Sequence, residues 1–193
     1  MILEPLDLYA LLFCRVVICL VFGLSAIGKM IDLVSFERAI TAFGLLPEQW
    51  SRGAAWVFLA GELGTAALML AGSNLLIWGF GMGLALLLIF SGALVLVLVR
   101  RQVIACHCFG PSRRTVSIHD LVRNGGLILC CCGGLGLLWA GSLQNATPTL
   151  ADGILTGIMA VTLAALLINV ADIVLVVRPV ARQRHQQHAQ EQQ

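Results

Sequence analysis

Residues 75–99 read LLIWGFGMGLALLLIFSGALVLVLV, an apolar run that contains no charged side chain. A helix rises about 1.5 Å per residue and the hydrocarbon core of a bilayer is roughly 30 Å thick, so about 20 apolar residues cross it once. This stretch is therefore long enough to form a transmembrane helix. Four other stretches approach or exceed the required length, namely residues 8–28, 54–72, 121–141 and 153–177.

The composition of the whole chain points to the same class of protein. Of its 193 residues, 59% are hydrophobic and 11% are charged, whereas an ordinary soluble domain is roughly 25% charged. A soluble globular protein is therefore excluded. We predict an all-α, polytopic membrane protein with five transmembrane helices, of which four form an antiparallel core and the fifth is a C-terminal span. No linker divides residues 1–177, so we expect a single domain in the lipid bilayer.

Two segments outside the spans have a distinct character. Residues 32–48 are amphipathic, because apolar side chains recur there at helical spacing between charged ones. We predict a short helix near residues 34–43 that lies in the membrane interface. Residues 178–193 are rich in Gln, His and Arg and have almost no apolar side chains. We expect that polar tail to be disordered.

Lys and Arg are placed asymmetrically. In a five-span arrangement, all of them except Arg15 lie in or beside the loops and tail on one side of the membrane: Lys29, Arg38, Arg52, Arg100, Arg101, Arg113, Arg114, Arg123, Arg178, Arg182 and Arg184. Because cytoplasmic loops are enriched in Lys and Arg, this predicts an outside N-terminus and a cytoplasmic loop at 100–120. The formal net charge is only +2, which is too small to suggest a nucleic-acid partner.

The polar loop contains the sharpest chemical signal, a pair of cysteines separated by one residue. Cys106 and Cys108 can close only a small, strained disulfide ring, which is easily reduced. Nearby positive charge favours the thiolate, which is the reactive species. That charge comes from Arg100, Arg101, Arg113, Arg114 and a protonated His107. We predict that Cys106 and Cys108 are a catalytic or relay pair for thiol–disulfide exchange.

Two other interpretations of the loop stay open. In the first, Cys106 and Cys108 are ordinary loop cysteines without a redox role. In the second, they bind a metal ion together with His119. The metal site is the weaker alternative because it offers only three ligands, and His107 cannot easily point at the same ion as both of its neighbours. We therefore expect no metal.

The other five cysteines lie within predicted spans, at positions 14, 19, 130, 131 and 132. Buried free cysteines usually pack as small hydrophobic side chains. Counted along their helices, however, Cys19 and Cys130 lie at similar depths, so we name Cys19, Cys130 and Cys131 as secondary thiol candidates. A contact between Cys19 and Cys130 near the midplane would allow electrons to pass between them. We expect the cysteines of the fourth span to be individually dispensable.

Arg15 and Glu62 are the two most deeply placed ionisable residues. An unpaired Arg in hydrocarbon costs from about 2.5 kcal/mol upward, so a partner is expected. We predict that Arg15 and Glu62 pair and hold the first span against the second. The functional alternative is a pocket for a substrate carboxylate or a quinone head group, and a quinone is the one cofactor that we consider.

Several motifs occur together in a fixed order: Arg15, VFGLSAIGK at 21–29, Phe36, GLLP at 44–47, ELG at 62–64, CHCFG at 106–110 and LVRN at 121–124. Together they resemble the MauE family of methylamine utilisation proteins, within the DoxX-like membrane superfamily. The resemblance covers roughly residues 8–141. The family commonly has Gly between the two cysteines where this chain has His107, which keeps the pair and changes its local acidity.

The resemblance implies a role in the biosynthesis, export or disulfide formation of the methylamine dehydrogenase small subunit, at the bacterial inner membrane. It also implies a thioredoxin-like partner of the MauD type. The chain would then be a component of a thiol–disulfide oxidoreductase system, or alternatively a non-catalytic chaperone or export scaffold for the same client. The client is periplasmic, whereas the arginine distribution predicts a cytoplasmic Cys106 loop.

Overall fold

The structure is a computed structural model that describes residues 3–44, 47–72, 74–100, 118–140, 157–159 and 161–162. This part of the chain is helical and contains no strand. Its helices are α1 (Leu3–Ile31), α2 (Leu33–Ala42), α3 (Glu48–Ala71), α4 (Leu75–Val99) and α5 (Ile118–Trp139). Four of them are long and apolar enough to cross a membrane: Asp7–Ile31, Gln49–Ala71, Leu75–Val99 and Ile118–Trp139.

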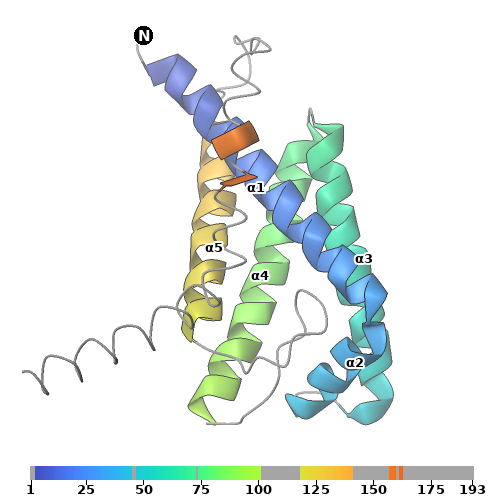
Figure 1. Cartoon of the computed structure of the whole chain (residues 1–193). Helices are drawn as coiled ribbons and strands as arrows, with labels where there is room; N and C mark the ends of the chain where they lie inside the picture. The colour runs from blue at the N-terminus through green and yellow to red at the C-terminus, as the bar shows by residue number, and fades with distance from the viewer. Residues whose placement is uncertain are drawn as a thin grey trace, which may run out of the picture.

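The four long helices form an antiparallel bundle, as predicted. Each packs against two neighbours, because α1 and α4 both contact α3 and α5. Successive long helices run in opposite directions, so that α1 descends, α3 rises, α4 descends and α5 rises in Figure 1. The predicted fifth span at 153–177 and the tail at 178–193 lie outside the described residues, apart from a few helical positions between 157 and 162.

The short helix predicted near residues 34–43 is α2. Asp32 caps its N-terminus, because its carboxylate accepts the backbone N–H of Ser35 at 3.0 Å. The chain leaves the helix at Gly44, which has a φ of 64° that other residues rarely adopt. Helix α2 packs its apolar face, including Phe36 and Ile40, against α3 at one end of the bundle (Figure 1).

Close contacts between glycine and large side chains hold the long helices together. The ring of Phe80 on α4 is fully buried and lies directly against Gly134 on α5. Gly83 in turn faces Phe22 of α1 and Cys131 of α5. Small residues at helix contacts let the backbones approach closely, which is the usual way for helices to pack in lipid.

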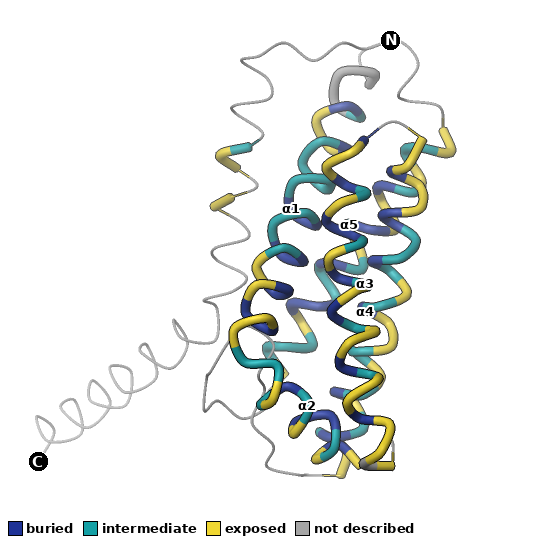
Figure 2. Tube along the Cα trace, turned by 90° about the vertical axis from the view of Figure 1, so that its right-hand side faces the viewer, coloured by how far each residue is buried: buried dark blue, intermediate teal, exposed yellow. Residues whose placement is uncertain are grey.

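The outer surface of the bundle is also apolar. Figure 2 shows exposed residues along the outward sides of the helices, and they include Leu129, Leu70 and Val57, each about 70% exposed. Exposed tryptophans occur towards both ends of the bundle, since Trp50 and Trp56 lie in the first half of α3, while Trp78 lies in the first turn of α4 and Trp139 ends α5. An apolar belt with tryptophan towards each end is typical of a membrane-spanning protein.

Candidate functional site

Arg15 does not pair with Glu62, so this prediction is wrong. Arg15 Nε donates to the carbonyl oxygen of Met69 at 2.7 Å, and Nη2 donates to that of Leu70 at 3.1 Å. These carbonyls belong to the last turn of α3, where backbone oxygens have no partner within the helix and carry partial negative charge. Arg15 therefore caps α3 and ties α1 to the end of the bundle opposite α2.

Glu62 is paired instead with Lys29, at the α2 end of the bundle. Lys29 Nζ lies 2.6 Å from Glu62 Oε1, and the two side chains are 3% and 11% exposed. Ser25 completes a triangle, because it accepts a hydrogen bond from Lys29 at 2.7 Å and donates one to Glu62 Oε1 at 3.0 Å. The three residues join α1 to α3 through a fully internal polar contact.

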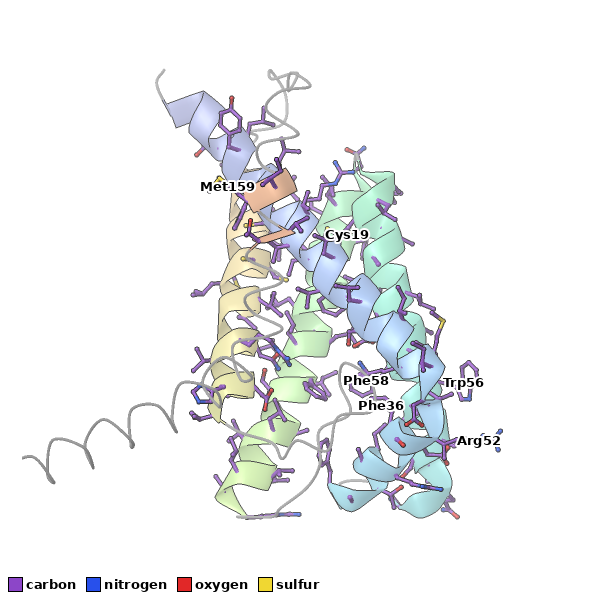
Figure 3. The ribbon with its side chains drawn as sticks, viewed as in Figure 1. Cys19, Phe36, Arg52, Trp56, Phe58 and Met159 are labelled. Atoms are coloured by element: carbon purple, nitrogen blue, oxygen red, sulfur yellow. The ribbon has the colours of Figure 1, made fainter. Side chains whose placement is uncertain are left out.

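Lys29 is the residue of this polar contact that the sequence does not single out, because it stands at the end of an apolar run, next to a predicted loop. Its position four residues after Ser25 was the available signal, since residues four apart share one face of a helix. The ammonium group also lies 4.8 Å from the ring centroid of Phe36 on α2. Phe36 packs edge-on against Phe58 of α3, and Figure 3 shows these two rings side by side. The ion pair thereby holds α2 on the bundle.

Helix α5 contributes a second buried polar group. Asn124 is 2% exposed and donates from Nδ2 to Ser91 Oγ on α4 at 3.3 Å. Arg123 Nη2 donates to Asn124 Oδ1 at 3.5 Å, and Arg123 Nη1 lies 3.9 Å from Asp120 Oδ1. Arg123 and Asn124 stand near the start of α5, yet both are buried in the bundle. Their side chains point inward because the apolar residues of α5 occupy the lipid-facing side.

A pocket lies between these two polar groups. It contains about 40 Å³ of free space, which is room for a few water molecules, since one needs at least about 10 Å³. Glu62 Oε2 is buried and has no hydrogen-bond partner among the described residues. The pocket is suited to water or a small hydrogen-bond donor at this oxygen. Its walls combine polar and aromatic side chains: Ser25, Lys29, Glu62, Arg123, Asn124, Phe22, Phe58 and Phe90.

Four of the five membrane cysteines, Cys14, Cys19, Cys130 and Cys131, lie in or against the main apolar core. Cys19 donates from Sγ to the carbonyl oxygen of Ala66 on α3 at 3.8 Å, and Cys14 and Cys130 pack at the edge of the main apolar core. Cys19 therefore faces α3, which does not support the alternative in which Cys19 meets Cys130 near the midplane. A helix turns about 100° per residue, so positions 14 and 19 point about 140° apart, and only one of them can face α5. Figure 3 shows Cys19 on α1.

The predicted exchange pair lies outside the described residues. This holds for Cys106, His107 and Cys108, for three of the supporting arginines, Arg101, Arg113 and Arg114, and for two of the three ligands in the metal alternative. Arg100 and Ile118, the described residues on either side of that segment, end α4 and begin α5. Both lie at the end of the bundle that carries α2 (Figure 1).

Comparison with known proteins identifies the family. The family model for the methylamine utilisation protein MauE matches residues 7–140. No curated protein and no solved structure gave a match. The matched region contains all four candidate membrane spans of the described residues, the Lys29–Glu62 pair, the buried Arg123 and Asn124, and the Cys106–Cys108 segment. Since it covers well over half of the chain, this membrane protein belongs to the MauE family of methylamine utilisation proteins.

Proposed function

We propose that this chain is a bacterial inner-membrane protein that supports maturation of the methylamine dehydrogenase small subunit by thiol–disulfide exchange at Cys106 and Cys108. The observation that carries the proposal is the family match together with a C-x-C pair inside the matched region. The flanking arginines favour the thiolate that exchange requires. A thioredoxin-like protein of the MauD type is the expected partner.

The exchange is balanced without a further reactant. A partner thiolate attacks one sulfur of the Cys106–Cys108 disulfide, which gives a mixed disulfide and a free thiolate on this chain. The second thiol of the partner then attacks the partner's own sulfur in the mixed disulfide and releases the remaining cysteine of this chain. The partner becomes the disulfide, and Cys106 and Cys108 become the dithiol. The reverse sequence delivers electrons to a client disulfide by the same steps.

The bundle supports this role by supplying a firm base for the loop. The segment between Arg100 and Ile118 starts and ends at the side of the bundle where Lys29, Glu62 and Asn124 lock the helices together. Because buried polar contacts fix one helix arrangement, the ends of the loop are held at a constant separation.

Single substitutions test the proposal against the scaffold alternative. Cys106→Ser and Cys108→Ser should each reduce mature methylamine dehydrogenase small subunit to the level of a strain that lacks this chain, while the variant proteins accumulate normally in the membrane. Cys132→Ser is the matched control, since Cys132 is an exposed thiol on α5, and it should leave maturation unchanged. Normal maturation in both loop variants would instead support a non-catalytic chaperone or export scaffold.

A further inference from the structure

All exposed charged side chains in the described part of the chain are arginines. They are Arg38 on α2, Arg52 on α3 and Arg100 at the end of α4. The described acidic side chains are buried or partly buried, and Asp32 and Glu62 are engaged within the protein. Figure 1 shows α2, the start of α3 and the end of α4 at one end of the bundle. The described side chains of that end therefore present positive charge outward.

Arg52 is accompanied by an aromatic side chain one helical turn away. Arg52 and Trp56 are four residues apart on α3, which places them on the same side of that helix. Both are exposed, and Figure 3 shows their side chains directed away from the bundle. Arg52 makes no ion pair with another described side chain. Its guanidinium is therefore available to a ligand outside the bundle.

The surface of α3 beyond Trp56 is apolar, so that charged, aromatic and aliphatic groups follow one another along one strip. Val57 is 69% exposed, and Ala60, one further turn along the helix, is also exposed. Counted from the start of α3, Arg52 lies about 6 Å and Trp56 about 12 Å along the helix axis. Phosphate, glycerol and acyl chain follow one another in the same order along a phospholipid, and tryptophan commonly lies at the head-group level.

The other two exposed arginines lack these features. Arg38 lines a surface hollow together with the acidic Glu37 and three residues that carry no aromatic ring. The carboxylate of Glu37 therefore offsets part of the charge of Arg38. One turn before Arg100, α4 carries only aliphatic side chains. Beside Arg52, in contrast, the space at Gly53 is open, because a Cβ there would meet no atom within 4 Å.

We infer that Arg52 and Trp56 bind the head group of an anionic phospholipid in the membrane leaflet on the α2 side. The guanidinium donates hydrogen bonds to the lipid phosphate, a geometry that suits arginine. The indole packs on the glycerol region, and the acyl chains cover Val57 and Ala60. A zwitterionic lipid offers the same phosphate but adds a positive group that Arg52 repels. A free phosphate ion can contact only Arg52, whereas a phospholipid uses the whole strip.

The test applies native mass spectrometry to the full-length chain in a neutral detergent, with equimolar phosphatidylglycerol and phosphatidylcholine of matched acyl chains. We expect the wild-type chain to retain phosphatidylglycerol in preference to phosphatidylcholine. Arg52→Gln should weaken the retention of phosphatidylglycerol roughly fivefold, as expected for the loss of one arginine at an anionic lipid surface. Arg52→Lys keeps the charge and should keep most of the preference. Trp56→Leu should also weaken retention, because the aromatic contact with the lipid is lost.

Arg38→Gln is the matched control, since it removes the same charge at the same end of the bundle and should leave retention nearly unchanged. A Cys106→Ser, Cys108→Ser double variant should bind as the wild type does, which separates this inference from the proposed function. The comparison of the two lipids on the wild-type chain needs no substitution, so it stays decisive if a variant fails to fold.

Three results would overturn the inference. Equal retention of the two lipids by the wild-type chain would show that the lipid charge is not recognised. Equal losses in Arg38→Gln and Arg52→Gln would show a diffuse attraction in place of a site. Release of phosphatidylglycerol by inorganic phosphate would show that the phosphate group alone accounts for binding.

Discussion

Lys29 and Glu62 form a buried ion pair, and the physics of such pairs makes each residue dependent on the other. Removing one partner leaves a charge in a medium that solvates it poorly, at a typical cost of about 3–5 kcal/mol. We expect Lys29→Met or Glu62→Leu alone to lower the thermal unfolding midpoint of the detergent-solubilised protein substantially. The loss should extend to α2, because Lys29 also contacts Phe36.

The double variant Lys29→Met, Glu62→Leu is the control for this prediction. Replacing both charges by apolar side chains of similar size is often neutral or stabilising, so the midpoint should recover towards that of the wild type. Single and double variants with equally low midpoints would show that shape, and not charge, is what these residues supply.

The partners of the charged residues are also where the sequence was least informative. Pairing Arg15 with Glu62 followed from counting side chains, yet Arg15 satisfies its donors on the backbone carbonyls of Met69 and Leu70. The free backbone carbonyls at the end of a helix are present whatever the residue types there, so the sequence does not indicate which side chain will bind them. The bond of Cys19 to α3 was not predicted for a related reason: the depth of a residue along a helix can be counted from the sequence, but the direction in which it points about the helix axis cannot.

The elements themselves were predictable, because hydrophobic length and helix-ending residues decide them locally. Helix α4 spans the predicted residues 75–99, and α2 begins after the Asp32 cap and ends just before Gly44. Helices α1 and α3 begin before the apolar runs do. Polar residues at these starts extend each helix beyond the hydrocarbon region, and no change in hydrophobicity marks where an exposed first turn begins.

The contact between α4 and α5 depends on a glycine. A Cβ at position 134 would lie 2.5 Å from Cζ of Phe80, a ring with no exposed surface. We expect Gly134→Ala to destabilise the bundle by about 1–3 kcal/mol, since overpacking forces the helices apart. Gly133→Ala on the same helix meets no atom within 4 Å, so it should be neutral or slightly stabilising. Thermal unfolding of the two variants in one detergent makes the comparison, and equal destabilisation would contradict it.

In the whole molecule, the antiparallel order of the helices determines which helix ends and charged residues lie on the same side of the membrane. Helix α2, the end of α4 at Arg100 and the start of α5 at Ile118 lie together at one end of the bundle (Figure 1). The N-terminal end of α1 and the Arg15 cap lie at the other. The antiparallel order therefore agrees with the prediction that Lys29, Arg38, Arg52 and Arg100 share a side.

The arginine distribution then predicts the side on which the loop thiols react. In intact cells, a membrane-impermeant thiol reagent should leave Cys106 and Cys108 unmodified, and it should label them once the inner membrane is permeabilised. A cysteine introduced at Asp7, close to the outside end of α1, is the control that should be labelled in intact cells. Labelling of Cys106 or Cys108 before permeabilisation would reverse the orientation and place these thiols on the outer side of the membrane, the side expected for the proposed client.

Trapping the mixed disulfide tests thiol–disulfide exchange most directly. In Cys108→Ser, the remaining Cys106 can attack or be attacked but cannot resolve the product, so the covalent intermediate should accumulate. Cells quenched with acid and separated without reductant should show this chain joined to a thioredoxin-like protein or to the dehydrogenase small subunit, and reductant should release it. The Cys106→Ser, Cys108→Ser double variant should show no such species. If Cys108→Ser accumulates normally in the membrane and forms no mixed disulfide that depends on Cys106, exchange at this pair is contradicted.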